Sequence, residues 1–285
     1  MHSYSTAVST LHELRKSGER KPDLVVSLGQ TLIDGGLTRK LGDEAWSVYE
    51  QIFIAALDVG RDDLAKTCLE RLEKRFPDSP RVELLLGMKY EAEKKLDQAL
   101  SIYEKILNED ETNMPVEKRK IALYKTMGHN QEAINALVRF LDVYYNDVEA
   151  WLELASLYLR QHLYQQAAFC LEELILLQPQ NHFYHLKYAE VLYTSDNIPL
   201  ALKEYCRVIE LCDDYVRALY GIKLCTYKLL NASSSASSSK ITGNTDSHTL
   251  SVLNELATER LLHVYSHKKC SKVIKDVVRE WLQNY

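Results

Sequence analysis

Residues 148–181 read VEAWLELASLYLRQHLYQQAAFCLEELILLQPQN, and this stretch decides the fold of the chain. Apolar residues recur there every three or four positions, in two runs separated by a short polar turn around His162. They are Trp151, Leu154, Ala155 and Tyr158 in the first run and Ala167, Leu171 and Leu174 in the second. Pro179 ends the second run because proline cannot continue the helical hydrogen-bond ladder. The stretch predicts two antiparallel helices.

The same pattern repeats along the chain with a period of 34 residues, marked by one small residue. Its members are Ala65, Ala99, Ala133, Ala167 and Ala201. This period is that of the tetratricopeptide repeat (TPR), a helix-turn-helix unit in which alanine leaves room for the paired helix. The units are expected to begin at Trp46, Pro80, Met114, Val148 and His182, and the first helix of a sixth at Val216.

Small and large side chains alternate where the two helices of a unit must pack closely. The small ones are Gly87, Ala155 and Ala189, and the rings beside them are Tyr90, Tyr124 and Tyr158. Gly60, Gly128 and His162 fall in the turns between the helices, and Pro77 closes the first unit. Two positions depart from the pattern, Phe53 at a small-residue position and Lys120 at an apolar one. Local geometry is expected to adjust there.

The sequence thus predicts an all-α, TPR-type α-solenoid with irregular capping helices at both ends. Residues 1–45 form the N-terminal cap, with helices at 6–16 and 23–34, and residues 46–230 form the repeat array. The serine-rich segment 231–248 is expected to be a flexible loop. Residues 249–285 should cover the open end with two helices. Their apolar positions are Leu250, Leu253, Leu256, Leu261 and Val264, then Val273, Ile274, Val277, Val278 and Trp281.

Composition excludes several functional classes. The formal net charge is −5, with no strongly basic stretch in the body of the chain, so nucleic acid is not expected as a ligand. The first twenty residues lack the apolar centre of a signal peptide, and no apolar run approaches the ~18 to 20 residues that cross a bilayer. Membrane contact is therefore expected to be indirect. The six cysteines show no C-x-x-C pair and are read as free thiols in a reducing compartment.

No catalytic motif occurs in the sequence, so we expect neither enzyme activity nor a cofactor. His263, His267 and Cys270 are spaced for one helix face, but a fourth ligand is missing, and we predict no metal site. Asn231 begins a glycosylation sequon, which we read as inert. The basic residues of the last helix are read as a solvated face, with anionic lipid as the alternative. They are Lys268, Lys269, Lys272, Lys275 and Arg279.

In TPR arrays the first helix of each unit lines a concave groove, which is where a protein ligand is expected. The predicted groove residues are Glu50, Ile54, Arg81, Leu84, Met88, Lys118, Lys125, Leu152, Ser156, Leu159, Phe183, Leu186, Glu190 and Tyr193. Most are apolar, and the Lys/Asn/Arg clamp with which TPR co-chaperones grip an acidic C-terminus is absent. Such a lining suits extended or helical protein segments held by apolar burial.

Two longer stretches narrow the family. They are LGDEAWSVYEQIFIAALDVGRDDLAKTCLERLEKRFPDSPRV from Leu41 and AAFCLEELILLQPQNHFYHLKYAEVLY from Ala167. They resemble subunit 2 of the endoplasmic reticulum (ER) membrane protein complex, in a fungal form, over residues 40–225. The resemblance rests on residues that TPR packing does not require, such as the turn from Gly60 to Ala65 and Asn181-His182.

The resemblance implies a non-catalytic scaffold at the cytoplasmic face of the ER membrane. Its partners would be other subunits of that complex, namely cytosolic segments of membrane subunits and one soluble subunit. The complex inserts tail-anchored and multi-pass proteins. A free TPR adaptor or co-chaperone that binds peptide segments of other proteins is the alternative, and an unrecognised enzyme is a more distant one.

Overall fold

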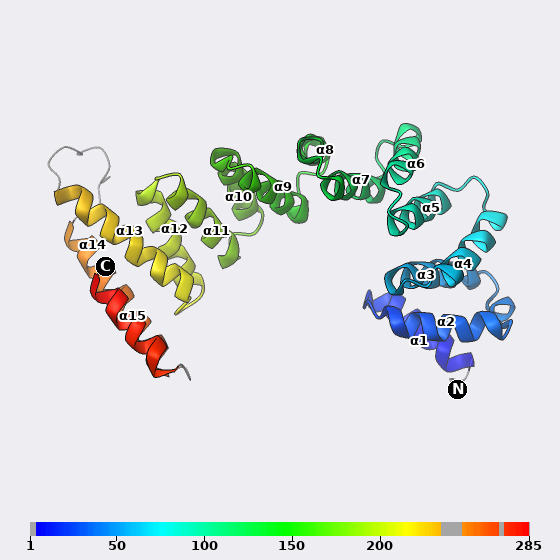
Figure 1. Cartoon of the computed structure of the whole chain (residues 1–285), viewed down its shortest axis with the longest axis horizontal. Helices are drawn as coiled ribbons and strands as arrows, with labels where there is room; N and C mark the ends of the chain where they lie inside the picture. Colours follow the sequence, from blue (N-terminus) through cyan, green and yellow to red (C-terminus); the bar gives the residue numbers. More distant parts are fainter. Residues whose placement is uncertain (1–3, 235–246, 268–270, 285) are drawn as a thin grey trace. The chain divides into compact units, whose positions relative to one another are not determined.

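Helices make up nearly all of the computed structural model, which describes residues 4–234, 247–267 and 271–284 (Figure 1). No strand occurs within these ranges. The helices are α1 (Tyr4–Ser17), α2 (Pro22–Asp34), the 3-10 helix η1 (Leu37–Leu41), α3 (Glu44–Val59), α4 (Asp62–Arg75), α5 (Pro80–Ala92), α6 (Leu96–Glu109), α7 (Met114–Met127), α8 (Asn130–Val143), α9 (Val148–Arg160), α10 (Tyr164–Leu177), α11 (His182–Thr194), α12 (Ile198–Leu211), α13 (Val216–Ser234), α14 (Ser247–His267) and α15 (Lys272–Asn284). The all-α repeat fold is confirmed.

One backbone conformation recurs in the turn inside each helix pair. The residue there has a positive φ, which is the left-handed conformation that reverses the chain after a helix. The φ angles of the residues at this position are 77° at Gly60, 60° at Lys94, 79° at Gly128, 59° at His162 and 65° at Asp196. These five positions are 34 residues apart, so the period fixes the turn even where the residue is not glycine.

The alanines that mark the repeat lie in the core of the fold. Ala65, Ala99, Ala133, Ala167 and Ala201 are all 0% exposed. Gly87 has the matching role on a first helix, because a Cβ atom there would lie 2.3 Å from Cε1 of Tyr103. Tyr103 on α6 is itself fully buried, so its ring fills the space that Gly87 leaves open.

The chain forms two compact units, Met1–Ala133 and Ile134–Tyr285, and the boundary falls within α8. In the N-terminal unit one core cluster runs from Ala7 to Leu85, and a second is centred on Tyr103 and Ile106. In the C-terminal unit one cluster joins Leu219 to α14 and α15. The division into caps, array and serine-rich loop at the boundaries given above stays a prediction.

Both departures from the repeat pattern are accommodated locally. Phe53 is 0% exposed and belongs to the first core cluster of the N-terminal unit. Lys120 keeps its ammonium group at the surface, 3.3 Å from a carboxylate oxygen of Glu104 and 5.8 Å from the ring centroid of Tyr124. Its aliphatic stem can therefore occupy an apolar position while its charge stays paired.

The C-terminal end differs in part from the prediction. Helix α13 continues to Ser234 and α14 begins at Ser247, so both ends of the predicted loop 231–248 are helical. The rest of that segment lies outside the described residues. Helix α14 packs along α13, so the sixth first helix does gain a partner helix.

The apolar positions predicted for the last two helices are also only partly buried. Leu256 is 43% exposed, because α14 buries Ala257 in its place. On α15 the contact with the core uses Val278 and Leu282. Val273, Ile274 and Val277 were predicted to help cover the open end of the array, but these side chains are 71%, 48% and 59% exposed. Throughout the described ranges, no helix is long and apolar enough to span a bilayer.

Candidate functional site

In the N-terminal compact unit, the first helix of each repeat carries predicted groove residues, which make up half of the predicted set. An ion pair links two of these residues. Arg81 on α5 reaches Glu50 on α3 through two contacts of 2.6 Å and 2.9 Å. The hydrogen bond to Glu50 raises the pKa of Arg81 above its ordinary value. Trp46 and Phe76 pack edge to face beside this pair, and the hollow between them measures about 240 Å³. The charge of Arg81 is thus neutralised within the protein.

The other predicted residues of this unit lie on three helices. Ile54 on α3 lines a separate hollow of about 250 Å³ against the turn that joins α1 and α2. Leu84 and Met88 on α5 are half-buried and pack against the core clusters. Lys118 and Lys125 are half-buried on α7. We call the surface carried by α3, α5 and α7 the N-terminal groove face.

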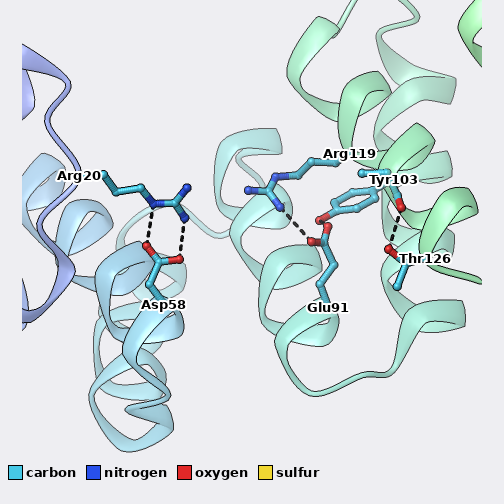
Figure 2. A network of polar contacts seen from close by, with 7 residues as sticks. Arg20, Asp58, Glu91, Tyr103, Arg119 and Thr126 are labelled. Carbon is cyan, nitrogen blue, oxygen red and sulfur yellow. Dashed lines mark hydrogen bonds and ion pairs between the residues drawn. The ribbon is translucent and has the colours of Figure 1, made fainter. Parts of the chain in front are cut away.

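A second charge pair lies on the same first helices and was not predicted. Figure 2 shows Glu91 of α5 between Tyr103 of α6 and Arg119 of α7. The Tyr103 hydroxyl donates a short hydrogen bond to Glu91, and Nη1 of Arg119 lies 3.0 Å from the same carboxylate. Burial, and then the hydrogen bond to Glu91, raise the pKa of Tyr103. Glu91 therefore joins three consecutive helices.

The same view contains an ion pair between the turn after α1 and helix α3. Arg20, in the turn after α1, binds Asp58 of α3 with contacts of 2.7 Å and 3.0 Å (Figure 2). The hydrogen bond to Asp58 raises the pKa of Arg20. This pair links the turn after α1 to α3 beside the hollow that Ile54 lines.

The C-terminal unit carries the remaining predicted residues on α9 and α11. Leu159, Phe183, Leu186 and Glu190 line one hollow of about 410 Å³, together with Tyr215 and Arg217 at the start of α13. Arg217 pairs with Glu190 at 2.5 Å. We call this surface the C-terminal groove face. It brings four residues predicted from sequence alone to one place.

The members of this face differ in exposure, and that decides which of them a partner can touch. Phe183 is 51% exposed, whereas Leu186 is 3% exposed and forms the floor. The Ser156 hydroxyl donates to the carbonyl of Glu153 in its own helix, at 2.7 Å. Tyr193 lies under the Lys228 ammonium, 5.1 Å from its ring centroid. Leu152 is half-buried on α9.

An aromatic cluster at the edge of the C-terminal groove face was missed by the sequence prediction. His182 and Phe183 have ring centroids 4.1 Å apart, and Tyr215 packs edge to face against both, at 5.3 Å and 6.1 Å. The signal that could have found it is the 34-residue period, because Tyr215 directly precedes the start of the next unit at Val216. The cluster presents apolar ring surface to solvent.

The groove faces offer apolar contact more than charge. Their arginines Arg81, Arg119 and Arg217 each pair with a glutamate of a neighbouring first helix. An incoming carboxylate would have to displace these partners, which disfavours acidic peptides. In the ranges that the structure describes, no group of three metal-ligating side chains occurs. The triad His263, His267 and Cys270 lies partly outside those ranges.

These features define a TPR repeat protein. The profile described as "Tetratricopeptide repeat" matches residues 45–79, and the one described as "EMC2 TPR-like repeat domain" matches residues 71–204. A TPR protein from Cytophaga hutchinsonii has a similar structure, with a TM-score of 0.59 at 14% identity. That likeness covers 87% of this chain and 95% of that chain and concerns the fold alone.

Curated relatives identify the family. ER membrane protein complex subunit 2-B of Xenopus laevis is 46% identical over 211 residues, which are 73% of this chain and 71% of the relative. The TPR repeat protein oca3 of Schizosaccharomyces pombe is 38% identical over 227 residues, or 78% and 80% of the two chains, which agrees with the expected fungal-like form. The chain belongs to the ER membrane protein complex subunit 2 family.

Proposed function

We propose that this chain is a non-catalytic scaffold subunit of the ER membrane protein complex, bound peripherally at the cytoplasmic face of the ER membrane. Its groove faces hold cytosolic segments of membrane-embedded subunits, and another part of its surface binds a soluble subunit. In this way the chain supports the insertion of tail-anchored and multi-pass proteins, while the insertion step itself belongs to other subunits. It needs no cofactor.

One observation carries the proposal beyond family membership. On both groove faces the arginines named above pair with glutamates of neighbouring first helices. Phe183 on the C-terminal groove face is exposed, and Leu84 and Met88 on the N-terminal groove face are half-buried. A protein segment that lies there gains apolar burial of about 25 cal/mol per Å². The exposed Lys187 at the C-terminal hollow can keep its ammonium group in water while its aliphatic stem adds to the apolar contact. Such a surface suits a partner held by shape and apolar contact, as the constant partners within an assembly are.

The test compares two single-residue variants in cells that assemble the complex. Phe183→Asp places a charge on the accessible ring position of the C-terminal groove face. Leu176→Asp is the matched control, because Leu176 is 74% exposed on α10 and lies outside both groove faces. Leu186 is unsuitable as a target, since a charge at a buried position would unfold the protein.

Recovery of membrane subunits with the tagged chain in mild detergent is the readout. Phe183→Asp is expected to lower recovery at least tenfold, while Leu176→Asp leaves recovery unchanged and both variants keep the wild-type helical content. Membranes should release the chain in alkaline carbonate. A wild-type chain that stays wholly in the soluble fraction as a monomer contradicts complex membership, and undiminished recovery with Phe183→Asp contradicts the use of the groove face.

A further inference from the structure

A second hollow lies on another side of the C-terminal unit. It measures about 600 Å³ and is enclosed by α8, α9 and α10. Its apolar lining consists of Val138, Leu141, Trp151, Leu154, Phe169 and Cys170. It shares no residue with the hollow of the C-terminal groove face. At ~100° per residue, Trp151 and Tyr158 lie roughly a third of a turn around α9 from the groove residues Leu152 and Leu159.

The aromatic wall of this hollow is held in place before any ligand arrives. The indole N–H of Trp151 donates to the carbonyl of Tyr145 at 2.8 Å, which fixes the ring. Phe169 packs edge to face on it, with centroids 6.1 Å apart. Phe169 is nevertheless 55% exposed and Val138 is 39% exposed. This is apolar surface that an occupant would remove from water, with little loss of side-chain freedom.

Among the residues that the structure describes, the only charged side chain in the lining of this hollow is negative. The polar lining consists of Asp142, Tyr158, Gln165 and Gln166, so Asp142 is the single carboxylate and no Lys, Arg or His faces the hollow. Within the described ranges, the Asp142 side chain has no ion pair or hydrogen bond. Burial raises the pKa of Cys170 to about 12 and that of Tyr158 above its ordinary value, so both stay neutral. A carboxylate beside aromatic faces attracts a cation and repels phosphate or carboxylate ligands.

Among cations the arrangement favours a guanidinium. An arginine side chain can stack on the ring of Trp151 or Phe169 and donate two parallel hydrogen bonds to the Asp142 carboxylate. The amide groups of Gln165 and Gln166 can pair with the backbone of the segment that carries it. A quaternary ammonium such as a choline headgroup has no N–H to donate and would gain only the ring faces. The volume also leaves room for the apolar neighbours of the arginine.

We propose that this hollow is a second docking site, which binds an arginine side chain and an adjoining apolar group presented by a segment of a partner protein. The site does not depend on the groove faces. It would allow the chain to hold two partners at once, each by a different surface and a different chemistry.

The test uses two small probes on the purified full-length chain labelled with ¹⁵N. The first probe is Nα-benzoyl-L-arginine amide, which joins a guanidinium to an aromatic group, and the second is its citrulline counterpart, which is neutral and of nearly the same shape. The chain has three tryptophans, Trp46, Trp151 and Trp281, so each indole N–H signal can be followed separately. Each signal is assigned by a Trp→Phe variant.

The arginine probe should shift the Trp151 signal in a saturable way, and the citrulline probe should bind about fivefold more weakly, as befits one exposed ion pair. Asp142→Asn should bring the two probes to equal affinity, and Phe169→Ala should weaken both. Phe183→Asp is the control that disables the groove face and should leave the titration unchanged, which separates this site from the proposed function. Equal affinity of the two probes for the wild type, or shifts confined to Trp46 and Trp281, overturns the proposal.

Discussion

Replacement of Gly87 by alanine should destabilise the N-terminal unit, although alanine is the better helix former. The new Cβ atom would lie 2.3 Å from Cε1 and 2.8 Å from Cζ of Tyr103, whose ring is fully buried. The ring must move, and its hydrogen bond to Glu91 is lost with it. Overpacking destabilises the folded state by about 1–3 kcal/mol and the lost hydrogen bond by about 1 kcal/mol. The higher helix propensity of alanine stabilises it by about 1 kcal/mol. The net loss is therefore about 1–3 kcal/mol.

Urea unfolding followed by far-UV circular dichroism measures this loss. Ala122→Gly, at an exposed position of α7, is the control that reports the propensity contribution in this chain. Combining Gly87→Ala with Tyr103→Leu removes the colliding ring, so the double variant should lose at least ~1 kcal/mol less than the sum of the two single variants. A Gly87→Ala chain as stable as the wild type, or strictly additive variants, would refute the packing account.

Three further predictions concern stability. Lys94→Gly should stabilise the chain by up to about 1 kcal/mol in urea unfolding, because φ is 60° there and glycine relieves the left-handed strain; a lower midpoint would contradict this. Burial raises the pKa of three thiols to about 12, those of Cys68, Cys170 and Cys225. Since unfolded thiols ionise near 9, the folded state should lose about 1 kcal/mol per thiol per pH unit between pH 9 and 12. The triple Cys→Ala variant should show a slope that is shallower by this amount, while Cys206 and buried tyrosines such as Tyr205 keep their own contribution. Buried His185 contacts Glu204 at 2.7 Å and the Pro179 carbonyl at 3.1 Å. Glu204→Gln should therefore lower the free energy of unfolding by about 1–3 kcal/mol. Glu210→Gln, at an exposed ion pair on the same helix, should lower it less.

The repeat could be predicted from sequence because its packing depends on residue size at fixed spacing. Ala167 had to be small and Pro179 had to end a helix, and both requirements are local. The left-handed turns at Lys94 and Asp196 were missed because neither residue is glycine, although they keep the period set by Gly60 and Gly128. In such cases the backbone requirement of the fold overrides residue preference.

The site was less predictable because its decisive contacts join distant parts of the chain. The groove residues themselves could be proposed from repeat positions. Their ion pairs could not, since Arg81 and Glu50 are 31 residues apart and Arg217 and Glu190 are 27 apart. The exposure of each member also depends on neighbouring helices, which is why Leu186 lies on the floor while Phe183 projects. At the C-terminal end, nothing in the apolar pattern of α15 distinguished buried Val278 from exposed Val277.

The pairing of arginine with glutamate between neighbouring first helices has a practical consequence for handling the protein. Dissolved salt screens the attraction between exposed charges, and the Debye length falls from ~8 Å at physiological ionic strength to ~3 Å at 1 M. Salts such as sulfate strengthen apolar association. A partner held on the groove faces should therefore resist washing at high ionic strength and leave when urea is added. A partner bound through Asp142 should instead lose affinity as salt is added, by up to about the fivefold that one exposed ion pair contributes, so the salt dependence of recovery distinguishes the two kinds of partner.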